Sequence, residues 1–357
     1  MLLATSKCFS SGLFQLEKGD TLESLDIAYE TWGCLNAEGN NAVLICHGYT
    51  NHQHAAGEPD GWFSGVIGPS KAINTQRYFV ISTNMLGSAY GSTGPASVDP
   101  ITREHYALEF PDITIADMVN AQVRLLDYLG VKQLAAVIGN SFGGHLALQW
   151  GIAYPQRMRS LVVIVSSIKG RGDSHVLYRL KHRFERACPG WNGGRYYGNE
   201  KKSGVFDEMV KLRLETLRNY GYENHIAAEH KGNQVAINKK LLEKSSQWAQ
   251  RFDANSLIVL RKAGIQFDVR EELSLIRVPV LYILSRTDKL FPPSISVEAM
   301  RMFFEAKVDT TYFEIDSENG HQAPSVDPAL WQTVIEEFLA NKAALGQFQN
   351  LSSRKLC

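Results

Sequence analysis

A sharp turn between an apolar strand and a helix is the feature that most constrains this sequence. Residues 134–138 form a short apolar run, and Gly139-Asn140-Ser141-Phe142-Gly143-Gly144 follows directly, ahead of a helix-like stretch at 146–153. Small residues two positions before and two after a serine let the chain turn tightly and present the hydroxyl at the end of the strand. The pattern predicts a nucleophile elbow at Ser141. The alternative, an ordinary glycine-rich turn, explains the flanking strand and helix less well.

Similar apolar runs recur along the chain and predict buried strands of a mostly parallel sheet, because they are apolar on both faces. These runs are residues 42–46, 78–82, 134–138 and 161–165, and the strand pattern resumes at residues 278–284 and 310–315. Helical spacing lies between them, most clearly over residues 113–129, where Thr114 and Asp117 form a capping pattern. The alternation of strands and helices predicts an α/β architecture with right-handed crossovers.

One stretch interrupts this alternation. Residues 168–275 are rich in charge, have helical spacing and contain no strong strand signal. We therefore expect an α/β core made of residues 1–167 and 276–357, with residues 168–275 inserted as a helical cap. The name "cap" is used below for this segment.

The composition excludes several classes of partner. The 357 residues carry 37 Lys and Arg against 37 Asp and Glu, so the basic excess typical of nucleic-acid binding is missing. Apolar runs are far shorter than the roughly 20 residues that span a bilayer. The five cysteines are odd in number and have no C-x-x-C spacing, and the first residues lack a signal-peptide core. We expect reduced thiols, no membrane and no nucleic-acid partner, and a cytoplasmic protein.

A serine nucleophile of this kind needs an acid and a base later in the chain, in the order Ser, Asp, His. Asp288 follows the predicted strand at 278–284, and His321 follows the one at 310–315. Both positions lie beyond the carboxyl end of a strand, where ligand and catalytic groups gather in α/β sheets. Read singly, Asp288 is a turn residue and His321 a solvated histidine. Together with Ser141 they predict a catalytic triad.

An oxyanion hole is the remaining requirement. His47-Gly48-Tyr49-Thr50 follows the strand at 42–46, so we assign one donor to the backbone N–H of Tyr49 and the other to that of Phe142. One such donor typically contributes about 3–4 kcal/mol to lowering the barrier. The pair His52 and His54 has no Cys or acidic partner at ligand spacing, so no metal site is expected.

Longer motifs resemble those of the homoserine O-acetyltransferase family, a branch of the α/β-hydrolase fold. They extend from about residue 25 to 325, and the Tyr-Gly-Ser-Thr-Gly-Pro segment is more specific than the elbow. The matching segments are residues 28–33 with 35–36, 67–72, 84–87, 90–95, 110–111 with 114–115 and 117–118, 139–144, 191–194 and 251–256.

The resemblance implies a catalytic role for Ser141, Asp288 and His321. It implies a double displacement in which Ser141 takes an acetyl group from acetyl-CoA and His321 then deprotonates the acceptor alcohol, such as homoserine. It also implies a tunnel beneath the cap, a homodimer formed through the cap, and no bound cofactor beyond acetyl-CoA as co-substrate.

The family holds the carboxylate of its acceptor with an Arg and a Tyr from the cap. Arg213 and Tyr220 are the best candidates, because they lie seven positions apart and share a face if the segment from residue 205 is helical. Arg218 and Lys211 are the alternatives under a shifted register. Solvated charges on a surface helix would explain the same residues.

Two positions depart from the family. Gln322 follows the predicted base, where the family has an Asp that contacts the ammonium group of the acceptor. A charge-assisted hydrogen bond is worth about 1.5–3 kcal/mol against about 1 for a neutral one, so Gln322 is expected to weaken the binding of an amino-acid acceptor. Phe142 replaces the family's Met or Leu and changes the shape of the pocket.

Two functions remain open at this point. The first is an O-acyltransferase with a thioester donor and a small hydroxylated acceptor. The second is an esterase or thioesterase that uses the same triad with water as acceptor. The fold alone does not decide between them. The resemblance favours transfer, Gln322 argues against an unmodified homoserine site, and the complete triad argues against a non-catalytic binding protein.

Overall fold

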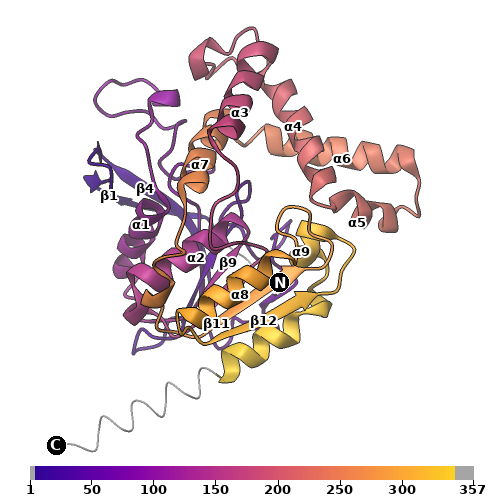
Figure 1. Ribbon diagram of the computed structural model, residues 1–357. Coiled ribbons are helices and arrows are strands. Elements are labelled where there is room, and N and C mark those ends of the chain that lie inside the picture. Colours follow the sequence, from indigo (N-terminus) through magenta and orange to yellow (C-terminus); the bar gives the residue numbers. More distant parts are fainter. Residues whose placement is uncertain (1–4, 342–357) are drawn as a thin grey trace, which may run out of the picture.

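An eight-stranded sheet forms the centre of the molecule (Figure 1). The structure is a computed structural model and describes residues 5–341. Six neighbouring strands run parallel, and all six lie at or within two residues of the strands predicted from the sequence. In sheet order these are β8 (Phe79–Thr83), β5 (Ala42–Cys46), β9 (Leu134–Asn140), β10 (Leu161–Ile164), β11 (Val280–Ser285) and β12 (Thr310–Ile315). The predicted α/β-hydrolase fold with a mostly parallel sheet is therefore confirmed.

Two further strands extend the sheet and were missed by the sequence analysis. They are β1 (Lys7–Ser11) and β4 (Leu25–Trp32), which pair antiparallel with each other, and β4 pairs antiparallel with β8. Polar residues such as Asp26 and Glu30 break up the apolar run of β4, which explains why the pattern for buried parallel strands did not find it. Two short two-stranded pairings complete the strands: β2 (Phe14–Gln15) with β3 (Thr21–Leu22), and β6 (Ile67–Gly68) with β7 (Ile73–Asn74).

Helices cover both faces of the sheet. One face packs against α1 (Ile115–Tyr128), α2 (Phe142–Ala153) and α8 (Ile295–Glu305). The other packs against the segment around Phe63 and a helix at 332–341. Helix α1 begins at Thr114 with the predicted capping box to Asp117. Successive residues of β5 point to opposite clusters, Leu44 to the first and Ile45 to the second, as alternation along a strand requires.

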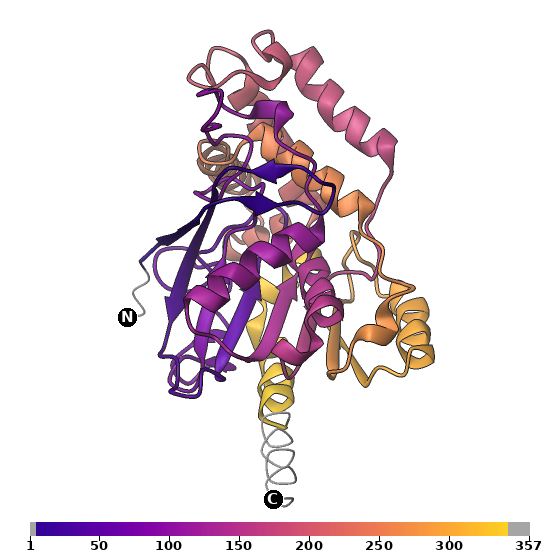
Figure 2. The same cartoon turned by 90° about the vertical axis from the view of Figure 1, so that its left-hand side faces the viewer.

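The chain between β10 and β11 forms five helices that lie beyond the carboxyl ends of the parallel strands (Figures 1 and 2). They are α3 (Ser174–Ala187), α4 (Val205–Asn219), α5 (Tyr222–Glu229), α6 (Gln234–Ala249) and α7 (Ala254–Gln266). Helices α4 to α6 share a small apolar cluster of their own, formed by Leu217, Ile226, Ile237 and Leu241. A bridge between Lys169 and Asp268 joins the two ends of the segment close to the sheet.

The sequence predicts reduced cysteines and no membrane-spanning segment. No helix in the described part, residues 5–341, is long and apolar enough to cross a membrane. Cys8, Cys34, Cys46 and Cys188 are free thiols, and Cys357 lies outside the described residues.

Candidate active site

The turn after β9 holds Ser141 in a backbone conformation that few residues adopt. Ser141 has φ 56° and ψ −119°. A Cβ at Gly139 would lie 2.0 Å from the carbonyl oxygen of Gly143, and a Cβ at Gly143 would lie 2.0 Å from that of Cys46. No side chain fits at either glycine, so both are required for the strand to turn into α2. Strained backbone of this kind is concentrated at functional sites.

Ser141, His321 and Asp288 form one hydrogen-bonded chain. Nε2 of His321 lies 2.8 Å from Oγ of Ser141, and Nδ1 lies 2.7 Å from Oδ2 of Asp288. The other carboxylate oxygen of Asp288 accepts hydrogen bonds from the backbone N–H groups of Leu290, at 2.7 Å, and Phe291, at 3.1 Å. The three residues are only 7, 5 and 2% exposed. The structure thus brings together the three residues selected from the sequence, with Asp288 fixed by backbone donors.

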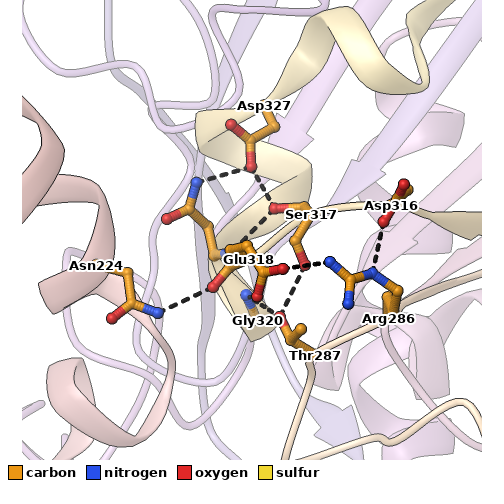
Figure 3. A network of polar contacts seen from close by, with 9 residues as sticks. Asn224, Arg286, Thr287, Asp316, Ser317, Glu318, Gly320 and Asp327 are labelled. Carbon is orange, nitrogen blue, oxygen red and sulfur yellow. Dashed lines mark hydrogen bonds and ion pairs between the residues drawn. The ribbon is translucent and has the colours of Figure 1, made fainter.

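The loop that carries His321 is fixed by polar contacts that Figure 3 displays. The carboxylate of Asp327 accepts hydrogen bonds from the hydroxyl of Ser317 and, at 2.9 Å, from the amide of Asn319. Gly320 N–H donates to Oγ1 of Thr287 at 3.1 Å, which connects this loop to the one bearing Asp288. The acid and the base are therefore positioned relative to one another by hydrogen bonds outside the triad.

Helices of the cap contact the same loop. Asn224 of α5 donates a 2.9 Å hydrogen bond to the carbonyl of Glu318 (Figure 3). The backbone N–H of Gln322 donates to the carbonyl of Tyr220 at 3.2 Å, and the ring of Tyr220 meets that of His321 edge-on, with centroids 4.7 Å apart. The residues at the end of α4 thus form part of the wall around the histidine.

The two residues assigned to the oxyanion hole, Tyr49 and Phe142, both lie beside the serine. Phe142 is the first residue of α2, and the first N–H groups of a helix have no partner within it. Gly48 lies against Ser141, because a Cβ there would be 3.4 Å from that of the serine. The preceding His47 accepts from the N–H of Met85 at 3.2 Å, and its other ring nitrogen lies 2.8 Å from the Gly48 carbonyl. Burial lowers the pKa of His47 to about 4, so a neutral ring holds the loop that presents Tyr49.

A small polar cavity opens on one side of the serine. Arg213 of α4 reaches into it, donates a 2.8 Å hydrogen bond to Oγ1 of Thr50 and lies over the ring of Trp248 at 5.1 Å. Burial lowers the pKa of Arg213, and none of the described residues that line the cavity is acidic. The cavity wall includes all three residues predicted to bind substrate and two of the triad: Ser141, Arg213, Tyr220, His321 and Gln322.

The two alternative cations lie elsewhere. Lys211 is exposed and pairs with Glu208 at 3.2 Å, while Arg218 is exposed and lies 3.5 Å from Glu223. The structure therefore selects the register in which Arg213 faces the serine. The sequence carried no local signal for Thr50 or Trp248, which position Arg213.

A second cavity, of about 90 Å³, also borders the serine. Phe142 lines it and stacks on Tyr49 with ring centroids 5.9 Å apart. The same ring lies against Gly264 of α7, where a Cβ would come within 2.7 Å of it. The space for the large Phe142 side chain thus depends on a glycine that sequence reasoning did not select.

The pair His52 and His54 serves packing and hydrogen bonding. Nδ1 of His54 lies 2.8 Å from the carboxylate of Glu30, and the His52 ring packs against Tyr90 at 4.9 Å. Across residues 5–341 no three His, Cys, Asp or Glu side chains gather as a metal-binding group would require.

Comparisons with known proteins show the family to which the chain belongs. A family model described as "alpha/beta hydrolase fold" matches residues 41–328. A homoserine O-acetyltransferase from Moorella thermoacetica is 37% identical over 351 residues, which cover 92% of this chain and 94% of that protein. The chain belongs to the homoserine O-acetyltransferase family. It is thus an enzyme of the acyltransferase type, as the resemblance in the sequence implied.

Two solved structures are similar over nearly the whole chain. The homoserine O-acetyltransferase from Bacillus anthracis has 28% identity and a TM-score of 0.83, covering 95% of this chain and 98% of that one. Esterase E22 has 27% identity and a TM-score of 0.83, covering 94% of this chain and all of that one. The family's structural relatives therefore include proteins named for transfer and for hydrolysis.

Proposed function

We propose that this enzyme is a serine-dependent O-acyltransferase that moves an acyl group from an acyl-CoA thioester to the hydroxyl of a small acceptor such as homoserine. The relatives are named for the transfer of an acetyl group, and acetyl-CoA is the proposed donor. The observation that carries the proposal is the hydrogen-bonded chain of Ser141, His321 and Asp288, placed where two cavities meet. One cavity is available for the acyl group, and the other, with Arg213, for an acceptor carboxylate.

The first half-reaction loads the enzyme. His321 takes the proton of Ser141 as Oγ attacks the thioester carbonyl, and the N–H groups of Tyr49 and Phe142 stabilise the oxyanion. The CoA thiol leaves with the proton from His321, and an ester on Ser141 remains. Asp288 keeps the imidazole in the tautomer that accepts the serine proton.

The second half-reaction discharges it. The acceptor hydroxyl gives its proton to His321 and attacks the ester, and Ser141 recovers a proton as the product leaves. Arg213 suits an acceptor carboxylate because its guanidinium is partly buried and already oriented by Thr50. Residues 168–275 act as the cap that encloses both cavities, and no bound cofactor is needed.

A specific observation supports hydrolysis as a second candidate. Gln322 supplies a neutral amide where an amino-acid acceptor would need a partner for its ammonium group, and the described lining of that cavity has no carboxylate. An acceptor that gains only a neutral hydrogen bond at this end binds more weakly by about 1 kcal/mol or more. The similarity to esterase E22 agrees with water as the alternative acceptor.

Intact-mass measurement tests the loading step. After incubation with acetyl-CoA, the wild-type protein is expected to carry one acetyl group and the Ser141→Ala variant none. Far-UV circular dichroism of the variant serves as the control for folding. An adduct of equal amount on Ser141→Ala would contradict the proposed nucleophile.

A further inference from the structure

The cavity beside Phe142 is lined by three nitrogen-bearing side chains that form no hydrogen bond or ion pair in the described part of the chain, although Arg171, which is largely exposed, lies over the ring of Phe291 at 5.5 Å. His145 of α2 lines it and is 4% exposed, and neither of its ring nitrogens has a hydrogen-bond partner. Arg261 of α7 and Arg171 line the same cavity, and within residues 5–341 neither guanidinium forms a hydrogen bond or ion pair. Buried polar groups are nearly always paired, so the unpaired His145 indicates a missing ligand group.

Arg261 reaches the chain segment that carries Arg171. Nη2 of Arg261 would be 3.2 Å from a Cβ at Gly172, the residue that follows Arg171. Burial lowers the pKa of Arg171, the charge of Asp288 opposes that effect, and the charge of Arg261 adds to it. None of the described residues that line this cavity is acidic. Two positive charges therefore border one small cavity whose described lining holds no carboxylate.

His145 contributes a polar contact rather than a third charge. Its ring stacks on Phe267 with centroids 4.5 Å apart, and burial lowers its pKa to about 3. A neutral imidazole offers one N–H donor and one acceptor. The cavity thus combines one neutral donor with two cations, a set that matches a single carboxylate.

The size and position of the cavity restrict what bears that carboxylate. Ser141 forms part of its wall, and its volume of about 90 Å³ corresponds to about three water molecules of liquid. A chain of a few atoms attached to Ser141 Oγ fits, whereas the nucleotide end of CoA does not. Arg213 lies in the other cavity, so an acceptor carboxylate already has its own cation.

We propose that the acyl pocket of this enzyme is built for a short acyl chain that ends in a carboxylate, held by Arg261, Arg171 and His145. This inference rests on the proposed function, since it names the acyl group that Ser141 receives. Ser141 Oγ bonds to the thioester carbon of the dicarboxylic monoacyl group, the C–S bond breaks, and the thiol leaves with the proton from His321. The distal carboxylate takes no part in the chemistry and stays ionised.

Acyl selectivity on two carriers tests the inference. Rates of Ser141 acylation are measured by intact mass with 3-carboxypropanoyl and butanoyl thioesters, each as the CoA thioester and as the phosphate-free N-acetylcysteamine thioester. Ser141→Ala supplies the background. The wild type is expected to prefer the carboxylated chain by about tenfold or more on both carriers, as a charge-assisted hydrogen bond predicts. Arg261→Met is expected to abolish most of that preference.

Lys262→Met is the matched control, because Lys262 is the next residue of α7 and pairs with Asp112 at the surface. Its preference is expected to stay within about twofold of the wild type. Equal acylation by both chains in the wild type, or an unchanged preference in Arg261→Met, would overturn the inference while leaving the acyltransferase proposal intact. Slower acylation of Ser141 by Arg261→Met that is confined to the CoA thioesters would also overturn the inference, because it would indicate that the arginine binds a phosphate of CoA. If no thioester labels Ser141, both proposals fail.

Discussion

Replacing Asp288 by Asn changes which nitrogen of His321 carries the proton. One carboxylate oxygen of Asp288 accepts two backbone N–H groups, and the other lies 2.7 Å from Nδ1 of His321. In Asp288→Asn the amide oxygen keeps the backbone donors, so the amide NH₂ faces Nδ1. Nδ1 then acts as an acceptor and the proton moves to Nε2. A protonated Nε2 no longer accepts the proton of Ser141, which lies 2.8 Å away.

The expected loss is large because the wrong tautomer removes the base. A change of this type costs about four orders of magnitude in kcat, or about 5.5 kcal/mol at about 1.4 kcal/mol per tenfold change. The assay is steady-state release of CoA thiol from acyl-CoA in the presence of an acceptor. Thermal unfolding of the variant checks that the protein remains folded.

Asp316→Asn is the matched control. Asp316 is an exposed carboxylate 2.5 Å from Arg286 near the same loop (Figure 3), and it touches neither Ser141 nor His321. Its kcat is expected to stay within about twofold of the wild type, since exposed ion pairs contribute little. A loss below about tenfold in folded Asp288→Asn, or equal losses in the two variants, would refute the assigned role of Asp288.

Three further changes give measurable outcomes. Gly143→Ala forces a Cβ to within 2.0 Å of a carbonyl oxygen and is expected to lower the free energy of unfolding by about 1–3 kcal/mol or more. Gly12→Ala is the control, because a Cβ there has no atom within 4 Å and is expected to change the free energy of unfolding little. Equal urea midpoints in the two variants would contradict this. Arg213→Met is expected to raise the KM for an amino-acid acceptor about tenfold or more, and Arg218→Met less than about twofold; equal effects would refute the assigned register. Burial lowers the pKa of His145 to about 3, so below about pH 6.5 the unfolded chain binds more protons than the folded one, and the free energy of unfolding decreases as the pH falls. Between pH 7 and 5 the free energy of unfolding of His145→Leu is expected to decrease by about 2 kcal/mol less than that of the wild type, and equal pH slopes in urea unfolding would contradict this.

The sequence predicted those parts of the fold that follow from local patterns. Apolar runs marked the parallel strands, and the capping pattern at Thr114 placed the start of α1. The antiparallel edge was missed because β4 carries Asp26 and Glu30 among its apolar residues. The edge strand β12 was found although it is only half-buried, since its β-branched and aromatic residues favour a strand.

The site was predictable in so far as its residues follow strand ends in a fixed order. Ser141, Asp288 and His321 each come after a strand that the apolar pattern had identified. Arg213 followed from helical spacing together with the resemblance. The contact between Arg213 and Thr50 joins residues 163 positions apart, and no local pattern contains such information. The same applies to Arg261, whose place in the cavity that Ser141 also lines depends on the contact between Gly264 of α7 and Phe142 of α2.

The fate of the acyl group on Ser141 tests the proposed transfer most directly. The enzyme is loaded with a thioester, separated from excess donor and mixed with buffer alone, homoserine or serine, and intact mass follows the loss of the adduct. Transfer predicts that at least one hydroxylated amino acid accelerates discharge by about tenfold or more at millimolar concentration, with the O-acyl product formed in equal amount. Rapid discharge in buffer alone that neither alcohol accelerates would contradict transfer and identify the enzyme as a hydrolase.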